Sequence, residues 1–182
     1  LHQVDTTRAV SIGALDETLS AGYNAHTTQV FGEIGRAFTQ IGTRFEPYAA
    51  LALVHQQSDG FTETGGDAAL IGASAAQTLG VTTLGIRAET KTREIGGREM
   101  AFHGGVAWRH AFGDVTPETS MRFAGGSAFG IAGAPVSRNS AILEAGIDIA
   151  VSANATLSFD FRGEIGGNVR DGTLTADFSA RF

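Results

Sequence analysis

The chain has 182 residues, of which 42% are hydrophobic and 18% are charged, and its formal net charge is −6. This balance excludes a disordered chain, which combines low hydrophobicity with high net charge, and the negative charge disfavours nucleic acid as a partner. No apolar run approaches the roughly 20 residues of a transmembrane helix, so helical membrane insertion is excluded. A membrane β-barrel is not excluded, because the hydropathy of alternating strands averages out.

Apolar and polar residues alternate with period 2 in about nine segments, as expected of an antiparallel meander. In chain order, the expected strands are a segment ending at residues 9–13, then 29–38, 44–56, 82–91, 100–112, 116–123, 141–151, 156–165 and 174–182. The last segment, LTADFSARF, places Leu174, Phe178 and Phe182 on one face, because successive side chains of a strand point to opposite sides.

The connections fall into two length classes. Residues 57–77 and 124–139 read as long loops of small residues, whereas TQIG, FGDVT and SAN read as tight turns. Short turns at one rim and long loops at the other are typical of an outer-membrane barrel. If both long loops lie at the same rim, an even number of strands must separate them. The expected strands between the two loops are therefore one too many or one too few.

The polar faces of the expected strands carry charges of both signs, and these can pair within a narrow lumen. They are Glu33, Glu46, Arg87, Glu89, Arg109, Arg122, Glu144, Asp148, Asp160, Arg162, Glu164, Asp177 and Arg181. Aromatic residues stand near strand ends on the apolar faces, where a membrane barrel has its interfacial girdles. These are Phe38, Phe45, Phe112, Phe123 and Phe182. A soluble β-sandwich also alternates and stays open as an alternative.

Several stretches resemble the autotransporter β-domain of Gram-negative bacteria. They include EPYAALALVHQQSDGFTETGGDAAL, TTLGIRAE, the run from WRHAFGDVTPE through AGGSAF and AGAP to FDFRGEIG, and the ending SARF. The resemblance extends from about Gln29 to Phe182. It implies an all-β, antiparallel, up-and-down transmembrane barrel of twelve strands, located in the cell outer membrane, whose N-terminal helix passes through the pore.

The resemblance also implies a function and partners. Domains of this family belong to type V secretion: they deliver an upstream passenger domain to the cell surface, and the barrel-assembly machinery helps to insert them among the outer-membrane lipids. Their terminal strand is the assembly signal, which here assigns Leu174, Phe178 and Phe182. The implied lumen-facing charges include Glu46, Arg87, Arg109, Glu144, Asp148, Arg162 and Asp177.

A complete domain of this family is longer than 182 residues. We therefore expect residues 1–182 to be a translocator β-domain that lacks its pore helix and first strands, with about nine of the twelve strands. Such a piece would expose a sheet edge, and exposed edges pair with other chains.

No residue set predicts catalysis or a cofactor. Ser74 and Ser127 lack the G-x-S-x-G elbow of hydrolases, and the five histidines are scattered singly. The segment SDGFTETGGD offers carboxylates without the spacing of an EF-hand, so calcium is only weakly indicated. We expect no enzyme activity, no metal and no cofactor. The alternative function is an autonomous outer-membrane barrel that acts as a structural protein or adhesin through its long loops.

Overall fold

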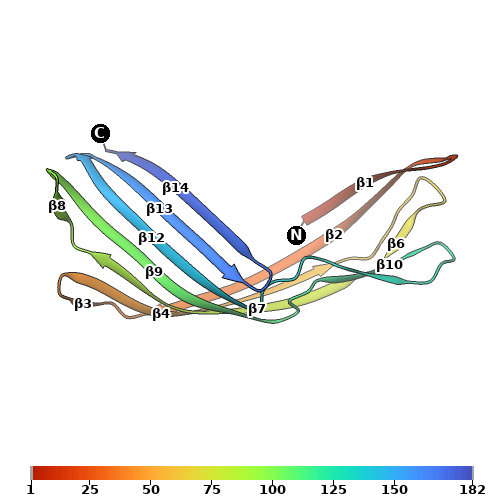
Figure 1. The fold of residues 1–182 in the computed structure, drawn as a ribbon. Coiled ribbons are helices and arrows are strands. Elements are labelled where there is room, and N and C mark those ends of the chain that lie inside the picture. Colours follow the sequence, from red (N-terminus) through yellow and green to blue (C-terminus); the bar gives the residue numbers. More distant parts are fainter. Residues whose placement is uncertain (1, 182) are drawn as a thin grey trace. The chain divides into compact units, whose positions relative to one another are not determined.

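The structure is a computed structural model that describes residues 2–181, and within this range it contains β-strands and no helix (Figure 1). The long strands are β1 (His2–Ile12), β2 (Leu15–Gly35), β4 (Thr43–Ser58), β7 (Ala75–Thr90), β9 (Arg98–Gly113), β12 (Asn139–Ser152), β13 (Ala155–Gly166) and β14 (Arg170–Ala180). The short strands are β3 (Phe38–Gln40), β5 (Phe61–Thr62), β6 (Leu70–Gly72), β8 (Arg93–Ile95), β10 (Glu118–Phe123) and β11 (Phe129–Ala132). The all-β, antiparallel fold class expected from the alternation is confirmed.

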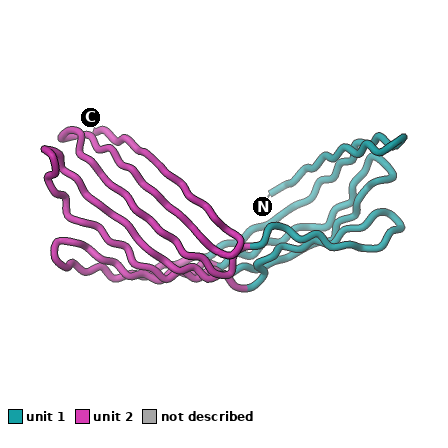
Figure 2. The backbone as a smooth tube through the Cα atoms, in the orientation of Figure 1, with its two compact units in different colours: residues 1–30, 53–80, 113–135 teal, residues 31–52, 81–112, 136–182 magenta. Residues whose placement is uncertain are grey.

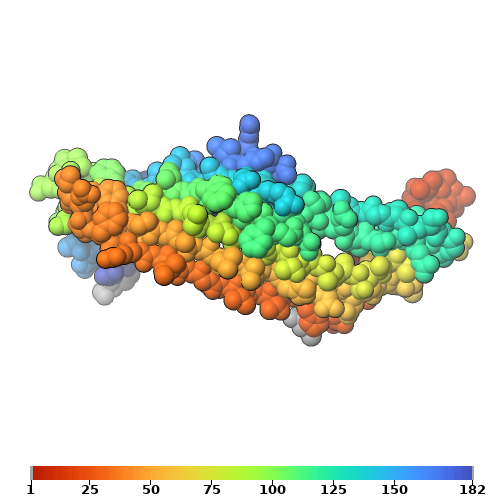
Figure 3. All heavy atoms as spheres, turned by 90° about the horizontal axis from the view of Figure 1, so that it is seen from below, coloured from red at the N-terminus to blue at the C-terminus, as the bar shows by residue number. Residues whose placement is uncertain are grey.

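The long strands form one sheet in the order β1-β2-β4-β7-β9-β12-β13-β14, with β3 paired to β4 and β8 paired to β9. Every long strand therefore lies beside the next long strand along the chain, which is an up-and-down meander. The space-filling view shows the strands of this sheet as neighbouring bands, from orange through green to blue (Figure 3). The terminal strand of the sequence analysis, 174–182, corresponds to β14 as far as residue 180.

One expected strand does not belong to this sheet. Residues 116–123 contain β10, which pairs with β11 and β6 in a second sheet of order β11-β10-β6-β5. The long sheet therefore has eight long strands rather than about nine. Only β7 and β9 then lie between the two long connections, so both connections leave the same end of the strands. The expected strand at residues 116–123 made the count between the two connections odd. This strand lies within the second connection and belongs to the second sheet, so the count becomes even.

The N-terminal hairpin is more extensive than the sequence indicates, where only a strand ending at residues 9–13 was expected. β1 and β2 pair over their first eleven residues around a turn at Gly13, whose φ of 61° suits a primed hairpin turn. The stretch DTTRAVS in β1 is rich in threonine and charge, so its alternation is weak. The segment expected at 29–38 is the end of β2, a break at residues 36–37 and the start of β3.

The turns at the other end of the strands are tight. β8 and β9 are joined through Gly96 and Gly97, with φ of 61° and 75°. β3 and β4 are joined through Ile41 and Gly42, with φ of 49° and 76°. Two consecutive residues with positive φ define a type I′ turn, which favours Asn-Gly or Gly-Gly. Ile41 is therefore an unfavourable residue at its position, and its side chain is 91% exposed.

The chain divides into two compact units (Figure 2). Unit 1 comprises residues 1–30, 53–80 and 113–135, and unit 2 comprises residues 31–52, 81–112 and 136–182. The fully buried Leu19 belongs to unit 1, and the buried Ile142 belongs to unit 2. Many large apolar side chains of unit 2 are exposed, including Val106, Leu143, Leu174 and Phe178. A soluble sandwich would bury such a face, so the burial pattern disfavours that alternative.

Within residues 2–181, no helix is long and apolar enough to cross a membrane.

Candidate functional site

The register of β9, β12, β13 and β14 separates the two faces of unit 2. One register row joins Phe102, Ile147, Phe159 and Ala176, and the next row toward the long loops joins Gly104, Ala145, Phe161 and Leu174. The row between them carries polar residues on the opposite face, namely His103, Asp160 and Thr175. The alternation expected from the sequence therefore holds across four neighbouring strands.

On the polar face, Arg87 of β7 is the centre of the first charged cluster. Its Nη1 and Nη2 donate to the two carboxylate oxygens of Glu33 at 2.7 and 3.0 Å, which is the bidentate geometry of a strong arginine–carboxylate pair. The guanidinium carbon lies 3.8 Å from the centre of the Tyr48 ring, within the range of a cation–π contact. Glu46 is 3.9 Å from Arg87 and accepts a hydrogen bond of 2.6 Å from Arg44.

Gly85 makes room for the Tyr48 ring beside this cluster. A β-carbon at Gly85 would lie 2.6 Å from the ring, well inside van der Waals contact. The tyrosine can therefore lie flat over β7, where it supports the guanidinium of Arg87. The alternation in the sequence places Glu33, Glu46, Tyr48 and Arg87 on polar faces. It does not show that the Tyr48 ring and the Arg87 guanidinium meet, because they lie on different strands.

The second charged cluster crosses β12. Glu144 pairs with Arg162 on β13, and Arg109 on β9 pairs with Glu164 on β13, two strands away. These contacts join groups on neighbouring or next-neighbouring strands of one face. The sequence predicts pairing of these charges across a narrow lumen. These four residues pair along the sheet, and pairing across a lumen stays a prediction.

His103 also reaches across β12. Its Nε2 lies 2.7 Å from Oδ1 of Asp160, and its Nδ1 lies 3.5 Å from Oδ2 of Asp148. The other oxygen of Asp148, Oδ1, accepts a hydrogen bond of 2.5 Å from the Ser158 hydroxyl. The register places Gly146 between His103 and Asp160. A β-carbon on Gly146 would overlap the imidazole, so the contact requires glycine there. In the sequence, His103 is one of five scattered histidines, so this contact was not predicted.

The seven charges expected to face a lumen have different surroundings. Six of them take part in the contacts above: Glu46, Arg87, Arg109, Glu144, Asp148 and Arg162. Asp177 lies on the same face, opposite Ser158 in the register, and is exposed. Arg122, included among the polar-face charges, lies in β10 of the second sheet and so is not part of this surface.

The apolar face carries two of the three expected assembly-signal residues. Leu174 and Phe178 are 76% and 67% exposed. They lie on β14 in the same register rows as Phe161 and Leu157. Phe182 lies outside the described residues. The signal role of all three remains a prediction.

Unit 1 has a separate charged contact that holds a loop. Glu63, between β5 and β6, is 8% exposed and accepts hydrogen bonds from Nη2 of Arg8 at 2.5 Å and from the Leu70 amide at 2.9 Å. Glu17 of β2 accepts from the amides of Asp67 and Ala68, each at 2.9 Å. The hydrogen bond from Arg8 outweighs the effect of burial and holds the pKa of Glu63 below its usual range.

The weakly indicated calcium site falls in this loop. The Glu63 carboxylate already accepts a hydrogen bond from Arg8. Oδ2 of Asp59 lies 3.4 Å from Nδ2 of Asn24. Within residues 2–181, no group of three or more histidine, cysteine, aspartate or glutamate side chains is arranged to hold a metal ion. Glu63 and Asp59 act in the structure as hydrogen-bond acceptors for the protein itself.

An antiparallel meander with one charged face, one exposed apolar face and long loops at one end defines an outer-membrane barrel protein. A model of the autotransporter β-domain family matches residues 1–162. The chain belongs to this family, whose members are outer-membrane translocators of Gram-negative bacteria. The resemblance found in the sequence is therefore confirmed, and the match begins at residue 1, ahead of the stretch from Gln29 in which it was found.

Two proteins are similar to the whole of this chain. Both are extracellular serine proteases of Serratia marcescens, each 36% identical to the chain over 182 residues. The match covers 100% of this chain and 17% of each relative. The chain thus spans about one sixth of the length of these relatives.

Proposed function

We propose that the chain anchors its parent protein in the outer membrane and carries an attached passenger domain to the cell surface. The observation that supports this proposal is the separation of the two faces in unit 2, with ion pairs on one and exposed apolar side chains on the other. In a membrane barrel, the polar face lines the lumen and the apolar face contacts lipid. Family membership supports the same arrangement.

The proposed lumen lining is Glu46, Arg87, Arg109, Glu144, Asp148, Arg162 and Asp177. Most of these charges have a partner of opposite sign on a nearby strand, so the wall is hydrated without a strong field of one sign. An extended passenger segment would therefore meet a polar surface to which neither its acidic nor its basic residues bind strongly. Such a surface suits transport of a polypeptide regardless of its sequence.

Adjacent residues of β12 test the orientation. Because the chain contains no cysteine, Glu144→Cys and Leu143→Cys can each be compared with the unmodified full-length protein in outer membranes. We expect a small, charged maleimide to label position 144 and a membrane-soluble maleimide to label position 143. The reverse pattern would show that the faces have been assigned the wrong way round.

We further propose that Leu174, Phe178 and Phe182 are the residues by which the barrel-assembly machinery recognises the last strand. The test compares Phe182→Ser with Phe159→Ser, which removes an aromatic ring from the apolar face on β13. We expect the first variant to lower the amount of assembled protein in the outer membrane far more than the second. Equal amounts for the two variants would contradict a signal role.

The upstream passenger is the third part of the proposal. The two relatives are named as extracellular proteases, and this chain corresponds to 17% of their length. We place any catalytic activity of the parent protein in the passenger, so that this chain itself is a transporter and an anchor. Replacing the passenger with an unrelated polypeptide should preserve surface display, whereas deletion of residues 1–182 should abolish it.

A further inference from the structure

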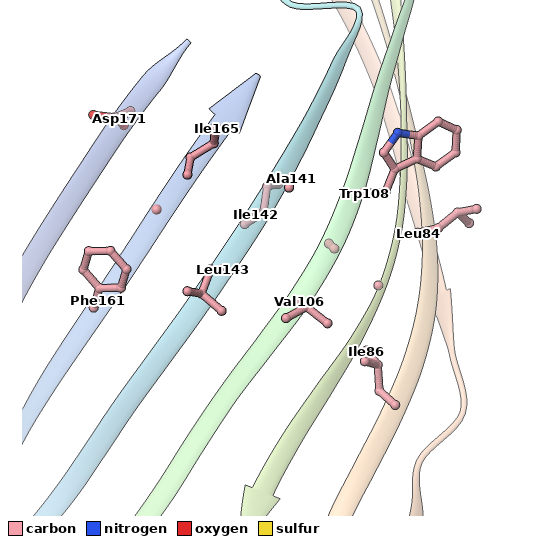
Figure 4. A pocket seen from close by; sticks show the side chains of 13 residues that line it. Leu84, Ile86, Val106, Trp108, Ala141, Ile142, Leu143, Phe161, Ile165 and Asp171 are labelled. Carbon is pink, nitrogen blue, oxygen red and sulfur yellow. The ribbon is translucent and has the colours of Figure 1, made fainter. Parts of the chain in front are cut away.

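The apolar face of unit 2 carries an open groove with a volume of about 700 Å³. Its walls are large side chains from β7, β9, β12 and β13, among them Ile86, Val106, Leu143, Phe161 and Ile165 (Figure 4). The lining is almost entirely apolar. The proposed function places the apolar face in lipid but gives this groove no role of its own.

Small residues form the floor of the groove. Ala141 and Gly163 line it between the larger side chains. Gly163 stands beside Leu143 in the register and beside Gly172 on the other side, so one row of the face has two glycines on neighbouring strands. The Phe161 ring leans toward them, since a β-carbon at Gly163 would lie 3.1 Å from the ring. The groove is thus a depression between bulky neighbours rather than a flat surface.

One end of the groove is polar. Trp108 donates from its indole Nε1 to Oδ1 of Asn139 at 3.2 Å, and Nδ1 of His110 lies 3.0 Å from the same oxygen. Tryptophan with its ring in an apolar surface and its N–H bound to a polar group is typical of a membrane–water interface. This end of β9 leads into a long loop, so the polar end faces the same side as the loops.

A positively charged residue, Arg170, lies in the same register row of the apolar face as Trp108. The register row that contains Trp108 continues through Ala141 and Ile165 to Arg170, the first residue of β14. No carboxylate lies within salt-bridge distance of Arg170 among the residues that the structure describes. Asp171, which also lines the groove, lies opposite Glu164 in the register and therefore belongs to the polar face. An arginine at the edge of an apolar surface can place its charge at the interface while its methylene groups contact hydrocarbon.

We infer that the groove binds a single anionic phospholipid, with an acyl chain between Leu143 and Phe161 and the phosphate at Arg170. The inference rests on the proposed orientation of the apolar face toward lipid. Arginine is well suited to bind phosphate through charge-assisted hydrogen bonds. The groove supplies shape for the chain, Arg170 supplies charge for the headgroup, and both lie in the adjoining rows of one face.

Trp108 makes the site measurable, because it is the only tryptophan in the chain. Full-length protein and its Trp108→Phe variant are placed in vesicles of phosphatidylcholine, and the difference between their emission spectra isolates Trp108. Phosphatidylglycerol or phosphatidylcholine with brominated acyl chains, which quench tryptophan on contact, is then added in increasing proportion. We expect brominated phosphatidylglycerol to associate about three- to fivefold more strongly than brominated phosphatidylcholine.

Three substitutions identify the source of this preference. Arg170→Gln should remove it, and Arg170→Lys should retain most of it. Arg98→Gln is the matched control. Arg98 lies on the same face of β9 as Trp108, because an even number of residues separates them, but it lies at the opposite end of the strand. This control should leave the preference unchanged.

The outcomes separate this inference from the proposed function. Quenching of Trp108 by both lipids with equal strength would overturn the phospholipid site while leaving the apolar face in lipid. A preference that survives Arg170→Gln would also overturn the site. Absence of quenching by either lipid would show that the apolar face does not contact lipid, which would contradict the proposed orientation as well.

Discussion

His103 and Asp160 meet across an intervening strand, with Nε2 and Oδ1 2.7 Å apart and only Gly146 between them. The two residues are 57 positions apart in the sequence, yet the register of β9, β12 and β13 puts them in one row. The contact exists because the middle strand has no side chain at this position. A glycine here is thus as important as the two residues that interact.

The first prediction concerns this glycine. In Gly146→Ala, the new methyl group overlaps the imidazole and lies 2.6 Å from Oδ1 of Asp160, so the His103–Asp160 contact must break. Gly172→Ala is the control, because its nearest new contact is an ordinary 3.8 Å to the Phe161 ring. We expect the free energy of unfolding of Gly146→Ala to be lower than that of the control by about 1–2 kcal/mol. Urea unfolding in detergent, followed by gel mobility, measures the difference.

A double substitution shows whether the contact is the cause. In a His103→Ala background, the imidazole is gone, so Gly146→Ala should cost no more than Gly172→Ala, because effects of residues in contact are not additive. If Gly146→Ala remained as costly without His103, backbone strain or the close approach to Asp160, rather than the lost contact, would be responsible.

The second prediction tests the two faces energetically. Leu143→Arg places a charge in the middle of the apolar face, where a lipid environment should lower the free energy of unfolding by about 2–4 kcal/mol. Thr173→Arg introduces the same side chain on the polar face, opposite Arg162 in the register, and should cost much less. Refolding into lipid vesicles over a denaturant series measures both. Similar costs at the two positions would argue against a lipid-facing apolar surface.

The third prediction concerns acid stability of the loop held by Glu63. Its pKa is lower in the folded protein than in the unfolded chain, because Arg8 donates to the carboxylate. The resulting stabilisation is complete above the ordinary glutamate pKa of about 4.3 and is lost as the pH falls through the lowered folded-state pKa. We therefore expect the Leu70 amide, which donates to Glu63, to stay protected at pH 5–7 and to lose protection only in more acidic solution.

Hydrogen exchange with mass spectrometry, corrected for the intrinsic effect of pH on exchange, measures this protection. Glu63→Gln should lower protection of the Leu70 amide at neutral pH and remove its acid dependence. Glu118→Gln, a substitution at an exposed position of β10, should change neither. Protection of the Leu70 amide that keeps its acid dependence in Glu63→Gln would assign that dependence to another group.

The fourth prediction uses the turn between β3 and β4. Ile41 has a φ of 49°, a region that β-branched residues disfavour and asparagine tolerates. Ile41→Asn creates an Asn-Gly pair in a type I′ turn and should raise the free energy of unfolding by about 0.5–1 kcal/mol. Ile95→Asn, an exposed isoleucine just before the Gly96–Gly97 turn, is the control and should give no gain. A denaturation series in detergent distinguishes the two, and a destabilised Ile41→Asn would show that the isoleucine side chain contributes contacts of its own.

Alternation predicted the strands of the C-terminal third well, because residues such as Leu143, Glu144, Phe159 and Asp160 change face with period 2. It also predicted polar-face charges of the long sheet such as Glu144 and Arg162, but it wrongly included Arg122, which lies in the second sheet. It failed for residues 116–123, since a strand that pairs in a small second sheet alternates just as one in the long sheet does. β1 was underestimated because a threonine-rich strand has little hydropathy contrast.

The individual contacts of the charged face were beyond sequence reasoning for a different reason. Pairing of His103 with Asp160, or of Arg109 with Glu164, depends on the register of three strands. That register is determined by the lengths of turns and loops and by one bulge near Ala150. Hydropathy indicates the face of each residue but not its neighbour on the next strand. The role of Gly146 becomes visible only when the row is known.

The contacts across β12 also distinguish correct from incorrect strand alignment. A slip of β12 by one residue would turn its apolar side chains to the polar face, which the separation of apolar and polar faces alone opposes. A slip by two residues keeps every side chain on its proper face, so hydropathy cannot detect it. Such a slip would place Glu144 or Asp148 under the imidazole of His103 and would remove Gly146 from the row. The contacts of the charged face therefore select the correct alignment of β9, β12 and β13. They disfavour a two-residue slip that would leave the apolar face equally apolar.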